Sequence, residues 1–258
     1  MQLPYLSSLC REGTAYRRDG LPSGGCALNV FYAPSDHVVG DLIRLPEDEA
    51  RHAVQVLRTK LGERVWVTDG SGNRYEAQVL SIGKRSLELK IVNRQFSPKE
   101  PLPVLAVGMI KSRERLEWLV EKSVELGVSK LILMQTERGE RSHVREDRLR
   151  AIQVSAMKQC LTSWLPELVT GVPFEAVLDE GKLAHQPMYI AHEKASSESK
   201  MLHTKTSAAP LLLVGPEGGF SDREVQLALD AGATMVSLGL RRLRAETAAL
   251  AVLCRAIE

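Results

Sequence analysis

The chain has 258 residues, 44% of them hydrophobic, and a formal net charge of only +2 at pH 7. This length suits one large domain or two modest ones, and the near-balanced charge excludes a histone-like polycation. The cysteines (Cys10, Cys26, Cys160 and Cys254) lack the paired spacing of a zinc site or a disulfide framework. No apolar run reaches the ~20 residues that a membrane span needs. We therefore expect a cytoplasmic protein with neither a metal nor a membrane partner.

Residues 1–28 show no clear periodicity and lack the apolar core segment of a signal peptide. We expect them to be a dispensable, disordered extension, or the product of a start codon placed upstream of the native one. The alternative is an RNA-binding arm that uses Arg11, Arg17 and Arg18.

Residues 29–97 show short, alternating apolar and polar patterns. Val65–Thr68 and Tyr75–Val79 flank Asp69–Asn73, which is typical of a hairpin loop. A short helix-like stretch covers residues 47–58. The pattern predicts a small β-barrel with one inserted helix. Residues 98–103 carry three prolines, which disfavour regular structure and stiffen the chain, so we place a linker there.

From residue 104 to residue 258 strands and helices alternate. Such alternation predicts an α/β domain whose mostly parallel sheet is covered on both faces. The expected strands are 104–109, 130–134, 188–191, 211–214 and 234–238, and the expected helices are 113–126, 146–160, 221–231 and 247–257.

Two loops follow strands near the end of the chain. Leu211–Val214 runs into the glycine-rich segment Gly215–Ser221, and Ser237–Arg244 leads from a strand to the last helix. Loops at neighbouring strand ends of a parallel sheet form one crevice, which is where open α/β sheets bind ligands. Neither loop matches a phosphate-binding Walker A or Gly-x-Gly-x-x-Gly pattern. The alternative is that the glycines form only a tight turn.

Four motifs carry a resemblance to a known family: Gly215–Ser221, Leu243–Ala248, Glu121–Gly127 and His52–Arg58. In their order along the chain, these motifs resemble those of the 16S rRNA (uracil-N3)-methyltransferases of the SPOUT class, and the resemblance runs from Asn29 to the C-terminus. The resemblance implies a PUA-like β-barrel domain that binds RNA, followed by a SPOUT domain with a trefoil knot. It also implies S-adenosylmethionine as cofactor, a homodimer, and 16S rRNA within the 30S subunit as substrate.

The resemblance assigns the two loops to the cofactor. The expected cofactor-binding residues are Leu213, Val214, Gly215, Pro216, Gly218, Gly219, Leu238, Gly239, Leu240, Leu243 and Thr247. Arg244 is expected to stabilise the anion that forms on uracil when N3 loses its proton, because a guanidinium is always charged and offers several donors. Glu217, Glu246 or water could remove that proton. Glu246 and Thr247 could instead serve as helix caps.

Basic residues outside the crevice could contact RNA, although each alone could equally be a solvated surface charge. The candidates are Arg51, His52, Arg58, Lys111, Arg138 and Arg141. Thr162 stands where many relatives carry an arginine, which weakens the case for RNA contact by that segment. Arg242 stands where relatives often carry an aliphatic residue, so it receives no role, and His192 is interpreted as an ordinary loop residue.

Two other functions stay open at this point. The chain could catalyse another SPOUT reaction, on a ribose 2′-oxygen or on a different base nitrogen. It could also be a non-catalytic RNA-binding dimer, but such a protein has no reason to keep two cofactor loops.

Overall fold

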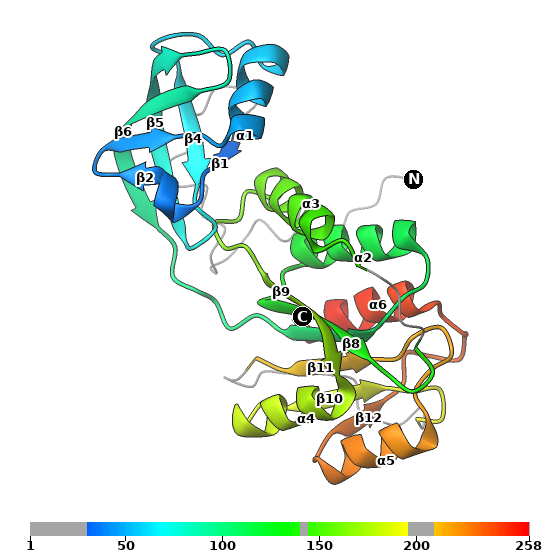
Figure 1. Ribbon diagram of the computed structural model, residues 1–258. Helices are drawn as coiled ribbons and strands as arrows, with labels where there is room; N and C mark the ends of the chain where they lie inside the picture. The colour runs from blue at the N-terminus through cyan, green and yellow to red at the C-terminus, as the bar shows by residue number, and fades with distance from the viewer. Residues whose placement is uncertain (1–29, 140–143, 196–208, 258) are drawn as a thin grey trace, which may run out of the picture.

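The computed structural model describes residues 30–139, 144–195 and 209–257, which form two six-stranded sheets (Figure 1). The predictions made for residues 1–28 and for Arg141 lie outside these ranges. The two sheets belong to two parts of the chain, and residues 97–103 join them without a helix or strand.

The first sheet is curled and has the strand order β1-β4-β5-β6-β3-β2. Its pairs are antiparallel, except that β1 runs parallel to β4. The strands are β1 (Val30–Tyr32), β2 (Val38–Val39), β3 (Leu42–Arg44), β4 (Arg64–Thr68), β5 (Asn73–Ile82) and β6 (Leu87–Phe96). Helix α1 (Glu47–Arg51) continues into a π-helical turn (His52–Val56), and a 3-10 turn (Ser35–His37) precedes β2. This part, which we call the β domain, confirms the expected small β fold with one helix.

The hairpin loop between β4 and β5 has a fixed shape. The carboxylate of Asp69, which is only 5% exposed, accepts hydrogen bonds from the backbone N–H groups of Ser71 and Asn73. It also accepts one from the Asn73 amide at 2.7 Å and one from the Tyr75 hydroxyl at 3.2 Å. Gly72 takes a φ of +94°, a value that favours glycine. A buried carboxylate with four donors holds the loop rigidly.

The second sheet has the order β12-β10-β11-β7-β8-β9. A mostly parallel sheet was predicted, and all of its strand pairs are parallel. Its strands are β7 (Val104–Gly108), β8 (Lys130–Gln135), β9 (Glu167–Pro173), β10 (Met188–Ala191), β11 (Leu211–Val214) and β12 (Thr234–Val236). The first strand along the chain, β7, therefore lies in the middle of the sheet.

Helices cover both faces of this sheet (Figure 1). Leu105 and Val107 of β7 pack with α2, α3 and α6 on one face. Val104 and Ala106 pack with α4 and α5 on the other, as the alternation of side chains along a strand requires. The helices are α2 (Arg113–Leu126), α3 (Glu146–Gln159), α4 (Phe174–Leu183), α5 (Asp222–Asp230) and α6 (Ala245–Ile257).

Local signals explain where α2 and α5 begin and end. The Ser112 hydroxyl caps α2 by accepting from the Arg115 N–H, and α2 ends at Gly127 with a φ of +95°. Ser221 and Glu224 form a reciprocal capping box at the start of α5. The trefoil knot and the placement of the domain boundary at residues 98–103 remain predictions.

Candidate functional site

A cavity of about 480 Å³ lies at the carboxyl ends of β10 and β11, and the segment that follows β12 completes its wall. Three neighbouring strands thus contribute to one hollow at the carboxyl edge of the sheet, where ligands bind in open α/β folds. Its lining residues are Arg138, Ala191, His192, Glu193, Val214, Gly215, Pro216, Glu217, Gly218, Gly219, Phe220, Leu238, Gly239, Arg241, Arg242, Leu243, Arg244, Ala245 and Ala248.

The first cavity loop follows β11 and folds back tightly on itself. The Gly219 N–H donates to the Pro216 carbonyl at 2.8 Å, and Gly219 takes a φ of +68°. A Cβ on Gly215 would lie 3.0 Å from Gly219 C and from Phe220 N. The loop is therefore built from backbone in close contact, which leaves N–H and C=O groups along the cavity wall.

The end of β7 supports this loop from behind. A Cβ on Gly108 would lie only 2.5 Å from the backbone nitrogen of Pro216. Glu224 adds a second support, because one carboxylate oxygen accepts from Ser221 N and the other accepts from Glu137 N, each at 2.8 Å. The loop after β11 is thus tied to the ends of β7 and β8.

The second cavity loop connects β12 to α6. Gly239 takes a φ of +107°, and its N–H donates to the Ser237 hydroxyl at 3.3 Å. The Arg255 guanidinium of α6 donates to the Ser237 carbonyl at 2.6 Å, so the last helix anchors the start of this loop. Arg244, at the end of the loop, is exposed and lines the cavity.

The structure brings most of the predicted cofactor-binding residues together on the cavity wall. These are Val214, Gly215, Pro216, Gly218, Gly219, Leu238, Gly239 and Leu243. Three others lie outside the lining. Leu213 is fully buried in the face that packs against α4 and α5, Leu240 is 99% exposed, and Thr247 is exposed in the first turn of α6.

The two predicted carboxylates differ in position. Glu217 lines the cavity, and one of its oxygens accepts from the Lys111 N–H at 3.2 Å. Glu246 is only 5% exposed, lies outside the cavity lining, and has an oxygen 3.6 Å from the Arg115 guanidinium. Its other oxygen has no hydrogen-bond partner among the residues that the structure describes. Of these two carboxylates, Glu217 is therefore the one within reach of a ligand in the cavity.

Several residues that line the cavity were not identified as site residues from the sequence. Ala191 ends β10 and His192 and Glu193 follow it, and Arg242 also lines the cavity although it received no role. Burial lowers the pKa of His192, and the nearby charge of Lys194 lowers it further. The sequence predicted that β10 is a strand, but it gave no sign that the end of β10 forms part of the cavity wall. That follows from the sheet order, which places β10 beside β11.

The predicted RNA-binding residues fall into two groups. Arg51, His52 and Arg58 lie on the β domain, where Arg51 pairs with Glu47 at 3.0 Å. Arg138 lines the cavity and donates to the Gly218 carbonyl at 3.3 Å, and the backbone N–H of Lys111 donates to Glu217.

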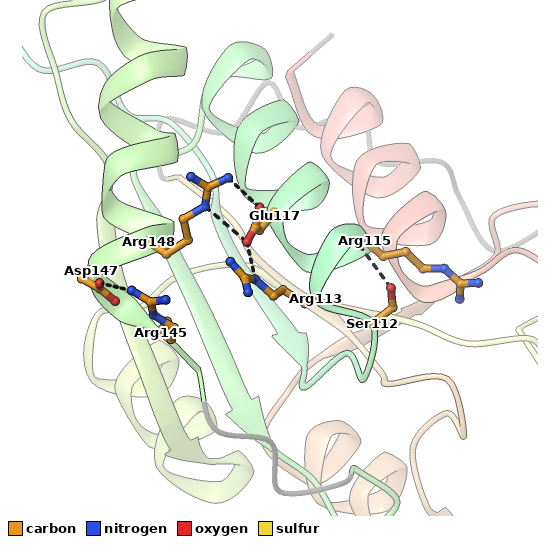
Figure 2. A network of polar contacts seen from close by, with 7 residues as sticks. All are labelled: Ser112, Arg113, Arg115, Glu117, Arg145, Asp147 and Arg148. Carbon is orange, nitrogen blue, oxygen red and sulfur yellow. Dashed lines mark hydrogen bonds and ion pairs between the residues drawn. The ribbon is translucent and has the colours of Figure 1, made fainter.

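Further arginines gather where α2 and α3 begin (Figure 2). Arg113 of α2 and Arg148 of α3 point toward Glu117, at 2.8 Å and 3.1 Å, and Arg145 pairs with Asp147 at 2.9 Å. Hydrogen bonds from Arg148 and then Arg113 lower the pKa of Glu117. The three arginine side chains are each more than half exposed, so this edge of the sheet presents guanidinium groups to solvent.

Within residues 30–139, 144–195 and 209–257, no group of His, Cys, Asp or Glu side chains is arranged to hold a metal ion. The helices of the same ranges include none that is both long and apolar enough to cross a membrane.

Comparisons with known proteins agree with this architecture. Residues 98–257 match the RNA methyltransferase domain family, and residues 45–92 match the RNA methyltransferase PUA domain family. The ribosomal RNA small subunit methyltransferase E of Mycobacterium bovis is 29% identical over 234 residues, which cover 87% of this chain and 89% of that protein.

Two solved structures are similar over 88% of this chain and 95% of their own, each with a TM-score of 0.76. One is a "probable rRNA-methyltransferase" from Porphyromonas gingivalis, at 35% identity. The other, at 30% identity, is the ribosomal RNA small subunit methyltransferase E of Neisseria gonorrhoeae bound to S-adenosyl methionine. With two family models and relatives matched over most of their length, this chain belongs to the RNA methyltransferase family that includes the ribosomal RNA small subunit methyltransferase E proteins.

Proposed function

We propose that this protein transfers a methyl group from S-adenosylmethionine to N3 of a specific uridine in 16S rRNA, within the 30S subunit and in the cytoplasm. The observation that carries the proposal is the cavity at three strand ends, with Arg244 on its wall. The relatives named as small-subunit rRNA methyltransferases support the substrate, and the relative bound to S-adenosyl methionine supports the cofactor.

The residues of the cavity fit this cofactor. Backbone groups of Gly215–Gly219 and Gly239 can bond to an adenine edge and to an amino-acid tail. Leu238 and Leu243 offer apolar surface to the rest of the molecule, and Ala248 closes the wall behind them. S-adenosylmethionine supplies an electrophilic methyl on a sulfonium, and this transfer needs no metal.

The chain must then present uracil N3 to that methyl group and stabilise the charge that develops as N3 loses its proton. Arg244 suits the second task, because its planar guanidinium stays charged and can donate to O2 or O4. Of the two predicted carboxylates, Glu217 is the one that lines the cavity, so it is our preferred proton acceptor, with water and Glu246 as the other candidates.

The experiment that tests the proposal is methylation of 30S subunits with purified protein, followed by mass spectrometry of the digested rRNA. We expect one added methyl on the base of a uridine, at N3. A methyl on ribose or on another base nitrogen would point to a different reaction of the same fold. No methylation, together with no binding of S-adenosylmethionine, would leave the RNA-binding dimer as the better description.

Gly239→Val is expected to abolish cofactor binding. The φ of +107° at Gly239 is strained for any residue with a Cβ, so the second cavity loop must change shape. Gly218→Val should have the same direction of effect, because its Cβ would lie 3.2 Å from Arg138 Cβ. Calorimetry with S-adenosylmethionine measures both. Gly232→Val, at a φ of +90° outside the cavity, is the control for backbone strain alone. Wild-type affinity in both cavity variants would contradict the loop assignment.

We further expect a homodimer through the C-terminal domain. Ala249, Val252 and Leu253 of α6 are fully buried against the sheet, while Leu250 and Ala251 on the same helix are partly exposed and apolar. A helix that is apolar nearly all round needs cover on more than one side, and symmetric dimers are the commonest assembly. Light scattering should give the mass of two chains, and a monomer at micromolar concentration would contradict this expectation.

A further inference from the structure

The β domain and the methyltransferase domain are joined by more than the linker. The rigid hairpin loop Asp69–Asn73 reaches the segment Leu161–Leu165, which follows α3. Gly72 N–H donates to the Ser163 carbonyl at 2.9 Å, and Leu165 N–H donates to the Gly70 carbonyl at 2.8 Å. Ser71 and Trp164 thereby pair as in an antiparallel sheet. We call these two segments, Asp69–Asn73 and Leu161–Leu165, the latch.

Trp164 is the central side chain of the latch. Its ring makes an edge contact with Phe96 at a centroid distance of 6.2 Å, and its Nε1–H donates to the Ser97 carbonyl at 2.9 Å. The Lys99 ammonium lies 5.6 Å from the ring centroid. A Cβ on Gly72 would lie 2.6 Å from the same ring. One side chain of the methyltransferase domain therefore contacts the hairpin, the end of β6 and the linker.

Charged groups reinforce the latch at two points. The Arg74 guanidinium of β5 donates to the carbonyl of Leu161, a residue that takes a positive φ of 60°. The Lys158 ammonium of α3 pairs with Glu49 of α1, which is only 7% exposed. The second oxygen of Glu49 accepts from Tyr32 N at 3.2 Å. Loss of either partner would leave the other charge partly buried and uncompensated, so the pair ties α3 to α1 specifically.

Apolar packing completes the junction. Tyr32 of the β domain packs against a cluster formed by Val124 of α2 and by Ala156 and Met157 of α3. Hydrogen bonds, an ion pair and apolar contacts thus act on the same small region. Two domains usually move relative to each other when their interface is small and polar. This junction combines apolar packing with hydrogen bonds, so we expect it to restrict such motion.

We propose that the latch is a positioning device that fixes the β domain relative to the methyltransferase domain and so determines which uridine reaches the cavity. The inference rests on the proposed function. RNA held by Arg51 and Arg58 of the β domain then lies at a fixed separation from Arg244, and only a nucleotide at that separation reaches the cavity. Trp164, Gly72, Arg74 and Glu49 act through this placement and touch neither cofactor nor base.

The test uses the full chain and a matched pair of glycines in the β domain. Gly72→Ala places a Cβ against the Trp164 ring, whereas Gly40→Ala, also at a positive φ, meets nothing within 4 Å. Trp164→Ala removes the ring itself. Small-angle X-ray scattering reports domain separation, calorimetry reports affinity for S-adenosylmethionine, and methylation of 30S subunits gives kcat and KM. Mass spectrometry of the digested rRNA locates every methyl group.

We expect Gly72→Ala and Trp164→Ala to separate the domains, to keep S-adenosylmethionine affinity, and to lower kcat/KM for 30S subunits by on the order of 10²-fold. They should also methylate uridines that the wild type leaves unmodified, while Gly40→Ala behaves as the wild type. An unchanged scattering curve, or separated domains with normal kcat/KM at the single normal uridine, would overturn the proposal. Failure of the wild type to methylate rRNA would instead count against the proposed function.

Discussion

Replacing Arg244 with alanine should slow methyl transfer by about 10²–10³-fold, the usual cost of losing one donor to a developing anion. Arg244 is exposed on the cavity wall, and we find no carboxylate paired with it in the described part of the chain. Its charge is therefore available to the base. Arg244→Lys should restore only part of the rate, because an ammonium keeps the charge but loses the planar fork of donors.

Single-turnover methylation of 30S subunits at saturating S-adenosylmethionine measures this effect, and calorimetry measures cofactor affinity beside it. Arg242→Ala is the matched control, since Arg242 lines the same cavity two residues earlier. An equal loss in both variants would show that the cavity needs only positive charge. Near-normal turnover of Arg244→Ala, or a defect confined to cofactor affinity, would refute the role given to this residue.

Gly108→Ala should remove most of the affinity for S-adenosylmethionine. Its Cβ would lie 2.5 Å from the backbone nitrogen of Pro216, a distance that real structures do not tolerate, so the loop after β11 must move. Moving that loop displaces Gly215 and Pro216 from the cavity wall. Affinity should fall at least tenfold, or about 1.4 kcal/mol.

The control for Gly108→Ala is Leu105→Ala on the same strand. Leu105 is fully buried, so its truncation should destabilise the fold by about 2–5 kcal/mol without touching the cavity loop. Thermal unfolding measures stability and calorimetry measures affinity at a temperature where both variants are folded. If Leu105→Ala loses as much affinity as Gly108→Ala, the contact between Gly108 and Pro216 has no special part in binding.

Much of the fold could be predicted from local signals. The bounds predicted for the helix 113–126 and for the strands 188–191 and 211–214 agree with α2, β10 and β11. Each of these elements is marked by a local feature of the sequence: a capping serine, a glycine at the end of a helix, or a short apolar run. Such features predict an element without information about distant residues. The glycines of the cavity could also be recognised, because their spacing after a buried strand is a local feature.

The missed elements lack such signals. Strand β9 lies at the edge of the sheet, is mostly half-buried, and has an irregular register near Gly171, so its side chains show no clean alternation. Helix α4 begins after Pro173 without a side-chain cap and contains Gly181. In both cases tertiary contacts, rather than local preference, determine the structure.

The rest of the site could not be predicted because it depends on strand order. His192 reaches the cavity only because β10 pairs with β11, and nothing near His192 in the sequence encodes that pairing. Thr162 differs from the arginine of many relatives, which is a feature of the sequence alone. The contacts of its neighbours Leu161 and Trp164 could not be predicted, because they depend on where the hairpin loop lies in the fold.

The central place of β7 in the second sheet has a consequence for how the protein is made. β7 pairs on one side with β8, which follows it closely in the sequence, and on the other side with β11, which is synthesised much later. Another part of the cavity wall belongs to α6, which follows all the strands in the sequence. Such distant pairings slow folding. The cavity can therefore assemble only after β10, β11, β12 and α6 have all been synthesised, so an unfinished chain that lacks any of these segments lacks part of the active site.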